Sequence, residues 1–387
     1  MKLFFIHPKS GQNRDDYEVP LNLLFLISSI KDMKNVNTEI LDFQLDGQDL
    51  SRIHSIPDEE HNVFALSVYT YSLSKAKDLC KFLRATKPMS KIVVGGPHVT
   101  ISTTSILTEI PEVDFAIAGE ADSSFPLLVN ALKNKKYKDE LRTIPGLIWR
   151  DEGKTKYNSI GKRFSCLDLL PKQTEGLPLF QLEEIKNRIG YMAYICSRGC
   201  PYSCIYCSSS NIWGQKIYFL SPSIVLEEIS KLVNTYGFKI FNFRDDFFTL
   251  NKRWLEEVLD GLAKLNVKWG CETRVDFVDK DLLRRMKDAG CVLIRYGIES
   301  FNQKSLDLLG KKLDVTKMLN NLELTFDIGI REVRCSFMIG IPGENPEDIE
   351  NTFKWCRKFP TMKARFWALH PVPGTYLYEN MQKYGIG

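Results

Sequence analysis

The 387-residue sequence lacks any apolar run of membrane-spanning length and any strong excess of one charge. Its longest apolar candidate, residues 21–30, has the length of a core helix, well short of the roughly 18 residues that a transmembrane helix needs. With 52 basic side chains against 48 acidic ones, a net charge of +4 gives no indication of nucleic-acid binding. The amino terminus runs directly into a strand pattern without a small-residue cleavage site, so we expect no signal peptide and a cytoplasmic protein.

The composition is that of an ordinary globular protein of about two domains. Hydrophobic residues make up 44% of the chain and charged residues 26%. In a cytoplasmic protein the ten cysteines should stay reduced, and those scattered singly along the chain are expected to be small core residues.

Four of the ten cysteines lie within residues 196–207. Only Cys200, Cys204 and Cys207 have the spacing C-x-x-x-C-x-x-C, because a register starting at Cys196 would need a cysteine at Ser203. Thiolates are the ligands of iron–sulfur clusters, and three of them on a four-iron cluster leave the fourth iron open to a small molecule. The alternative is structural zinc or a closed cluster with Cys196 as a fourth ligand, although structural zinc usually needs a second C-x-x-C pair, which is absent.

Before this loop, short apolar runs alternate with helical patterns. The runs lie at residues 3–6, 38–41, 63–68, 91–94 and 114–117, and the helical segments include 20–31, 72–85 and 123–133. This alternation predicts a parallel sheet with helices on both faces, in which ligands bind at the carboxyl ends of the strands. Those ends carry Asp42, Gln44 and Gly47, then Ser67, Tyr69 and Thr70, then Gly95, Gly96 and His98, and finally Gly119 and Glu120. Any one of these glycines could instead serve a tight turn.

Residues 141–190 do not continue the alternation of strands and helices, and their pattern predicts a hairpin followed by a linker. Two strand-like runs flank Gly153, and prolines 171 and 178 indicate an irregular crossing segment. From residue 191 the strand–helix alternation restarts. We expect strands at 192–195, 240–243, 268–271, 292–296, 332–339 and 364–369, and a helix at 221–236.

The three-cysteine loop, with Tyr206 before its last cysteine, resembles the cluster loop of the radical S-adenosylmethionine (SAM) enzymes. The four strand ends of the first domain resemble the cobalamin-binding domain that precedes many radical SAM domains. The resemblance implies an α/β chain with a Rossmann-like doubly wound parallel sheet at residues 1–140 and a hairpin and linker at 141–190. A partial (β/α)6 barrel would follow at 191–387, with its active site at the carboxyl ends of the strands.

The resemblance also implies a cobalamin site. Family members with a cobalt-ligating histidine carry it in a D-x-H-x-x-G loop, which in this chain has Asp42, Gln44 and Gly47. An amide is a poor cobalt ligand, so we expect cobalamin without a protein histidine ligand, its lower face covered by water or by Tyr69 or Thr70. His98 would lie by the corrinoid's nucleotide tail. The alternative is a domain that no longer binds cobalamin.

For SAM, the resemblance implies contacts at successive strand ends of the second domain. Asp245 and Asp246 suit the ammonium group, or else they cap the following helix. The guanidinium group of Arg274 suits the carboxylate of SAM, to which it could donate two hydrogen bonds. Glu299 could accept hydrogen bonds from the ribose hydroxyls or from the amino group of SAM. The remaining candidate contacts are Tyr206 in the cluster loop, Gly340, Pro342 and Gly343 along the adenine, and His370 at the last strand end.

The implied function is that of a cobalamin-dependent radical SAM enzyme. A 5′-deoxyadenosyl radical would abstract hydrogen from an unactivated carbon of a small molecule or natural product, and methylcobalamin would then supply a methyl group. Electrons would come from a flavodoxin- or ferredoxin-type donor. Relatives with the same domains perform cyclisation, ring contraction or other rearrangements, and a non-enzymatic iron–sulfur protein is a further alternative.

Overall fold

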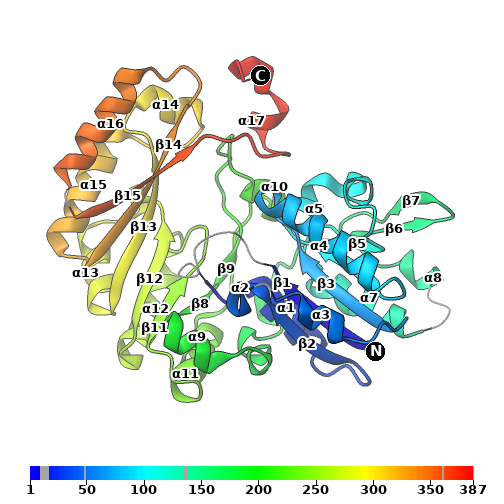
Figure 1. Ribbon diagram of the computed structural model, residues 1–387. Coiled ribbons are helices and arrows are strands. Elements are labelled where there is room, and N and C mark those ends of the chain that lie inside the picture. Colours follow the sequence, from blue (N-terminus) through cyan, green and yellow to red (C-terminus); the bar gives the residue numbers. More distant parts are fainter. Residues whose placement is uncertain (9–16, 48, 135–137, 360, 387) are drawn as a thin grey trace. The chain divides into compact units, whose positions relative to one another are not determined.

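The computed structural model describes residues 1–8, 17–47, 49–134, 138–359 and 361–386. The chain forms two compact units (Figure 1). The first comprises residues 1–164 and 169–189, and the second comprises residues 165–168 and 190–387. Both have parallel strands connected by helices, so the predicted α/β class is confirmed. No helix among the described residues is long and apolar enough to cross a membrane.

The first unit is built on a seven-stranded sheet with the order β2-β1-β3-β4-β5-β6-β7. Its first five strands are parallel. Apart from the edge strand β2, whose first three residues are polar, they are mostly apolar, as expected for strands covered on both faces. Their bounds are β1 Lys2–His7, β2 Asn37–Asp42, β3 Asn62–Ser67, β4 Lys91–Gly95 and β5 Phe115–Ile117.

Helices cover both faces of this sheet. One face packs against α4, whose Leu79, Cys80 and Leu83 join Phe64 and Ile92 of the strands in a buried core. On the other face Phe5 contacts Phe125 of α7, which packs against α1. The helices of the unit are α1 Leu21–Ile30, α2 Phe43–Asp46, α3 Ser51–Ser55, α4 Leu73–Thr86, α5 Pro97–Ser102, α6 Ile106–Glu109, α7 Ala121–Lys133, α8 Lys138–Leu141 and α9 Leu182–Arg188.

The hairpin expected within residues 141–190 extends the first sheet. Strands β6 (Leu147–Asp151) and β7 (Lys154–Tyr157) pair antiparallel with each other, and β6 pairs antiparallel with β5. Gly153 turns the hairpin in the left-handed region, with φ of 75°. Short 3₁₀ helices follow at Gln173–Glu175 and Leu177–Leu179.

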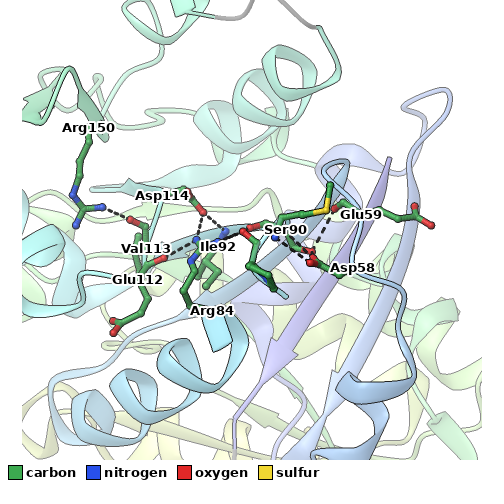
Figure 2. Close-up of polar contacts among 11 residues, drawn as sticks. Asp58, Glu59, Arg84, Ser90, Ile92, Glu112, Val113, Asp114 and Arg150 are labelled. Atoms are coloured by element: carbon green, nitrogen blue, oxygen red, sulfur yellow. Dashed lines mark hydrogen bonds and ion pairs between the residues drawn. The ribbon is translucent and has the colours of Figure 1, made fainter. Parts of the chain in front are cut away.

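Charged side chains fix the loops at the amino edge of this sheet (Figure 2). Arg84 of α4 donates to Asp114 at 2.6 Å, and the same carboxylate accepts the backbone N–H of Ile92 at 2.8 Å. Asp58 accepts from the hydroxyl of Ser90 at 2.9 Å. These groups satisfy one another, which indicates a structural role for the amino edge.

The second unit contains a six-stranded parallel sheet with the order β15-β14-β13-β12-β11-β8. All six strands fall where the sequence predicted them. Their bounds are β8 Met192–Tyr194, β11 Ile240–Phe243, β12 Lys268–Thr273, β13 Cys291–Glu299, β14 Glu332–Ile339 and β15 Met362–Ala368. A two-stranded antiparallel ribbon pairs β9 (Ser197–Arg198) with β10 (Tyr218–Phe219), and the three-cysteine loop lies between these two strands in sequence.

Asparagine or aspartate side chains begin five helices of this unit by accepting a backbone N–H of the first turn. These caps are Asn251, Asp279, Asn302, Asp314 and Asn345. The helices are α10 Ser209–Trp213, α11 Pro222–Asn234, α12 Lys252–Leu265, α13 Lys280–Asp288, α14 Gln303–Leu308, α15 Val315–Ile328, α16 Pro346–Lys358 and α17 Tyr376–Glu379. Each connection returns the chain to the amino edge, so the carboxyl ends of the strands share one edge.

Candidate functional site

The three-cysteine loop begins just after the carboxyl end of β8 and is fixed by backbone hydrogen bonds on both sides. The N–H of Ile205 donates to the carbonyl of Leu309 at 3.0 Å, and the carbonyl of Ile205 accepts from Leu377 at 2.9 Å. Within the loop, the N–H of Cys207 donates to the carbonyl of Cys204 at 3.0 Å. Segments more than 100 residues downstream therefore hold this loop in place.

The thiols of Cys200, Cys204 and Cys207 are all partly exposed. Burial, with a smaller contribution from the two other thiolates, raises the pKa of Cys207 to about 11. Burial also raises the pKa of Cys200. Among the described side chains, no group of three histidines, cysteines, aspartates or glutamates could hold a single metal ion as it stands. Three thiols on one loop fit a four-iron cluster that takes one thiolate per iron and leaves one iron open.

Cys196 differs from these three thiols in its burial. It is fully buried, and its backbone N–H donates to Oδ1 of Asp245 at 3.0 Å. Burial, followed by the charges of Asp245 and Glu228, raises the pKa of Cys196 well above its usual value. The structure therefore gives no support to Cys196 as a fourth ligand.

Tyr206 connects the cluster loop to the end of β13 through a buried ion pair. Its hydroxyl donates to Oε1 of Glu299 at 2.9 Å, and the same oxygen accepts from Nζ of Lys311 at 2.9 Å. The side chains of Glu299 and Lys311 are only 7% and 10% exposed. Burial opposes the charge on Lys311, but nearby Glu299 and Cys204 outweigh it and raise the pKa of the lysine. Sequence reasoning found Tyr206 and Glu299 but missed Lys311, which belongs to no motif.

The backbone around Glu299 is shaped for this contact. Glu299 has φ of 68°, which a non-glycine residue rarely adopts, and the pairing of β13 with β14 shifts register between Gly297 and Glu299. A Cβ on Gly297 would lie 2.7 Å from Oε1 of Glu299 and 3.0 Å from Nζ of Lys311. Left-handed backbone at a buried, charged position is typical of functional sites.

Arg274 does not offer the open fork that the sequence predicted. Its Nε and Nη2 each donate to the carboxylate of Asp276 at 2.9 Å. Its Nη1 donates to the carbonyl of Lys311 at 2.8 Å, and its guanidinium lies 3.8 Å from the ring centroid of Tyr202. The side chain thus fixes the segment that carries Lys311 and Tyr202, a local pairing that strand-end position alone could not reveal.

The two aspartates after β11 differ from each other. Asp245 is fully buried, its Oδ1 accepts from Ser197 and Cys196, and its Oδ2 has no hydrogen-bond partner in the described part of the chain. Asp246 is exposed and accepts from the hydroxyl of Ser209. Neither caps the following helix, because Asn251 begins α12, so the helix-cap interpretation is wrong. Asp246 is the accessible carboxylate of the pair.

Further along the same edge, the turn after β14 is closed by a side chain that the sequence did not single out. Glu344 accepts the backbone N–H of Gly340 at 2.8 Å and that of Ile341 at 3.2 Å. Gly340 and Gly343 have φ of 82° and 79°, which glycine adopts without strain. Pro342 lies between these glycines, and His370, just beyond β15, is exposed.

In the first unit, the predicted cobalamin residues lie at the carboxyl edge of the parallel strands. Asp42 ends β2 beside His7, which ends β1, and Ser67 of β3 pairs with Gly95 of β4. Burial opposes ionisation of Asp42, but hydrogen bonds, chiefly from His7 and Tyr17, hold its pKa below the usual value. Gly119 and Glu120 follow β5, and Glu120 pairs with Arg163 at 3.0 Å.

Gln44 and His98 are both buried. Gln44 lies in α2, which ends at Gly47 in the left-handed region with φ of 84°. His98 uses both ring nitrogens, with Nδ1 3.0 Å from Oγ1 of Thr70 and Nε2 3.0 Å from a carboxylate oxygen of Glu109. His98 therefore has no free ring nitrogen for cobalt.

Two other features shape the same edge. Tyr69 stacks on Tyr71 with ring centroids 5.3 Å apart, and burial raises the pKa of Tyr69 to about 12. Gly96 has φ of 99°, and a Cβ there would lie 3.0 Å from the carbonyl oxygen of Val68. Glycine at this position therefore allows two strand ends of the carboxyl edge to approach closely.

Comparison with known families identifies the class of protein. Residues 194–356 match the model of the radical SAM superfamily, and residues 12–129 match that of the B12-binding domain. The chain therefore combines a B12-binding domain with a radical SAM domain, as the cluster loop and strand ends predicted. The two domains assign it a [4Fe–4S] cluster, SAM and cobalamin as cofactors.

Individual relatives cover most of the chain. It is 29% identical to an uncharacterized methyltransferase of Pyrococcus horikoshii, over 93% of this chain and 78% of that protein. It is 25% identical to an anaerobic magnesium-protoporphyrin IX monomethyl ester cyclase of Cereibacter sphaeroides, over 99% of this chain and 64% of that protein. The solved structure of the radical SAM methyltransferase TsrM from Kitasatospora setae, with cobalamin and a [4Fe-4S] cluster bound, shares the fold, with a TM-score of 0.77 and 15% identity. That alignment covers 97% of this chain and 73% of TsrM.

Proposed function

We propose that this protein is a methyltransferase that transfers a methyl group to an unactivated carbon of a small molecule. The proposal is carried by one observation. A single chain combines a three-thiol loop fixed at the carboxyl edge of its second sheet with a B12-binding domain, and it is similar over 93% of its length to a methyltransferase. The substrate of TsrM, as its structure with bound tryptophan indicates, is also a small molecule.

When bound, the cluster with SAM supplies a radical that removes hydrogen from the substrate, and cobalamin supplies the methyl group. The chain's own residues hold and position these groups. Cys200, Cys204 and Cys207 hold the cluster through their thiolates. The buried pair of Glu299 and Lys311 fixes Tyr206, and with it the loop that bears the thiols.

Two kinds of group in the second unit suit the polar parts of SAM. Asp246 is the exposed carboxylate next to the loop and suits the ammonium group. The turn of Gly340 and Gly343, held by Glu344, presents backbone suited to the adenine. In the first unit, the corrinoid would lie at the carboxyl edge of the parallel strands, where Gly96 lets two strand ends approach closely. A flavodoxin- or ferredoxin-type protein would supply the electron.

The test uses SAM that carries a deuterated methyl group and needs no knowledge of the substrate. Anaerobically reconstituted protein is loaded with hydroxocobalamin, reduced and incubated with the labelled SAM. We expect S-adenosylhomocysteine to form and the recovered corrinoid to carry the deuterated methyl group. Formation of 5′-deoxyadenosine alone, with no label on the corrinoid, would contradict methyl transfer.

A second candidate is oxidative cyclisation or a related rearrangement. It is favoured by the alignment with the magnesium-protoporphyrin ester cyclase, which covers 99% of this chain. A cyclase consumes SAM only through 5′-deoxyadenosine, so the same experiment distinguishes the two reactions.

A further inference from the structure

His7 lies at the point of the first sheet where a ligand is expected. In the strand order β2-β1-β3, the second strand of the chain lies on one side of β1 and the third strand lies on the other side, so the strand order reverses there. In open parallel sheets of this order, ligands bind at the carboxyl ends of the two strands that border this reversal, here β1 and β3. Ile6 pairs with Leu66, so His7 and Ser67 end these two strands next to each other.

The imidazole of His7 is held in one orientation by a carboxylate. Its Nδ1 lies 3.0 Å from Oδ1 of Asp42. Asp42 is itself fixed by the hydroxyl of Tyr17 at 2.7 Å and by the backbone N–H of Leu45 at 3.1 Å. A carboxylate whose other bonds are satisfied in this way keeps the proton on Nδ1, which leaves the lone pair on Nε2.

The Nε2 atom of His7 has no hydrogen bond to any residue that the structure describes, and the side chain is 21% exposed. The other histidines of the first unit do not share this arrangement. His98 has both nitrogens engaged, and His54 and His61 are exposed and lack a carboxylate partner within the described chain. His7 alone among the described histidines of the unit combines a fixed Nδ1, an open Nε2 and a place at the switch point.

We propose that Nε2 of His7 ligates the cobalt of the bound corrinoid on its lower face, with Asp42 as the carboxylate partner of the ligand. Histidine ligands of metals usually donate their second ring N–H to such a partner, which fixes the ring and raises its basicity. Imidazole is also a far better cobalt ligand than the Gln44 amide in the D-x-H-x-x-G frame. His7 thus takes the place of water or of the corrinoid's own base. The proposal rests on the cobalamin assignment made by the B12-binding domain.

The decisive measurement is electron paramagnetic resonance of the full-length protein loaded with cob(II)alamin. In unlabelled protein, one axial nitrogen of spin 1 splits each cobalt line into three. In protein grown with ¹⁵N-histidine, we expect each line to split into two, because ¹⁵N has spin one half. Three lines that persist in the labelled protein would show that the corrinoid's own base is the ligand, and unsplit lines would show water. Either result overturns the proposal.

Variants separate ligation from folding. His7→Ala should lose the histidine splitting, whereas His61→Ala, the matched control, should keep it. Asp42→Asn should weaken cobalamin binding about 10- to 100-fold and reduce the histidine-bound fraction. Circular dichroism verifies that each variant is folded. A His7→Ala protein that keeps the two-line pattern would refute the assignment. Failure of unsubstituted protein to retain any corrinoid would overturn the proposed function as well, whereas retained corrinoid without the histidine signal overturns the role of His7 alone.

Discussion

The buried ion pair beneath the cluster loop predicts a large loss of stability when its cation is removed. In Lys311→Met the carboxylate of Glu299, 7% exposed, keeps only the hydroxyl of Tyr206 as a partner. Breaking a buried pair in this way typically costs about 3–5 kcal/mol. Because the hydrogen bond from Tyr206 remains, we expect a loss of about 3 kcal/mol, at the lower end of this range. Five of the six tryptophans lie in the second unit, so tryptophan fluorescence during urea unfolding reports on it. We expect the urea midpoint to fall by about 1 M.

A double variant tests the cause of this loss. The cause of the loss is an unpaired carboxylate held in the buried interior. Glu299→Gln combined with Lys311→Met removes both charges and should recover more than half of the loss. A single variant that loses less than about 1 kcal/mol, or a double variant whose losses simply add, would refute the reasoning.

Three further predictions follow from the local geometry. Gly297→Ala should cost about 1–3 kcal/mol, since its Cβ would lie 2.7 Å from Oε1 of Glu299, and an unchanged urea midpoint would argue against this crowding. Burial raises the pKa of Asp245 to about 7, so the carboxyl destabilises the fold increasingly as the pH rises from about 4 to about 7. Asp245→Asn should gain stability over the unsubstituted protein across that range, by up to about 4 kcal/mol, and a pH-independent difference would contradict the shift. Gly96→Ala should reduce corrinoid retention after desalting, because its φ of 99° and crowded Cβ force the strand end to move, and full retention would count against a corrinoid at this edge.

The fold was predictable because each helix and strand follows a local pattern of apolar and polar residues in the sequence. Apolar runs of four to eight residues alternate with amphipathic stretches, and that alternation gives parallel sheets whose carboxyl ends share one edge. Cys200, Cys204 and Cys207 could be separated from Cys196 by spacing alone. The structure adds that Cys196 is fully buried and that its backbone N–H donates to Asp245.

The polar partners of the site were not predictable, because they depend on contacts between distant segments. Lys311 comes 105 residues after Tyr206 and reaches its hydroxyl only through the fold. Arg274 donates to the carbonyl of Lys311, 37 residues away, in addition to its pairing with nearby Asp276. A role for His7 could be inferred only from the structure, in which the pairing of β1 with β2 places this residue beside Asp42.

The central claim is that three thiols, and not four, hold a cluster that cleaves SAM. It is tested most directly by measuring 5′-deoxyadenosine formed from SAM by anaerobically reconstituted and reduced protein. Cys204→Ser should abolish this product, whereas Cys196→Ser should keep both the cluster absorbance and SAM cleavage. Cleavage that survives Cys204→Ser, or a cluster lost in Cys196→Ser while the protein stays folded, would contradict the account.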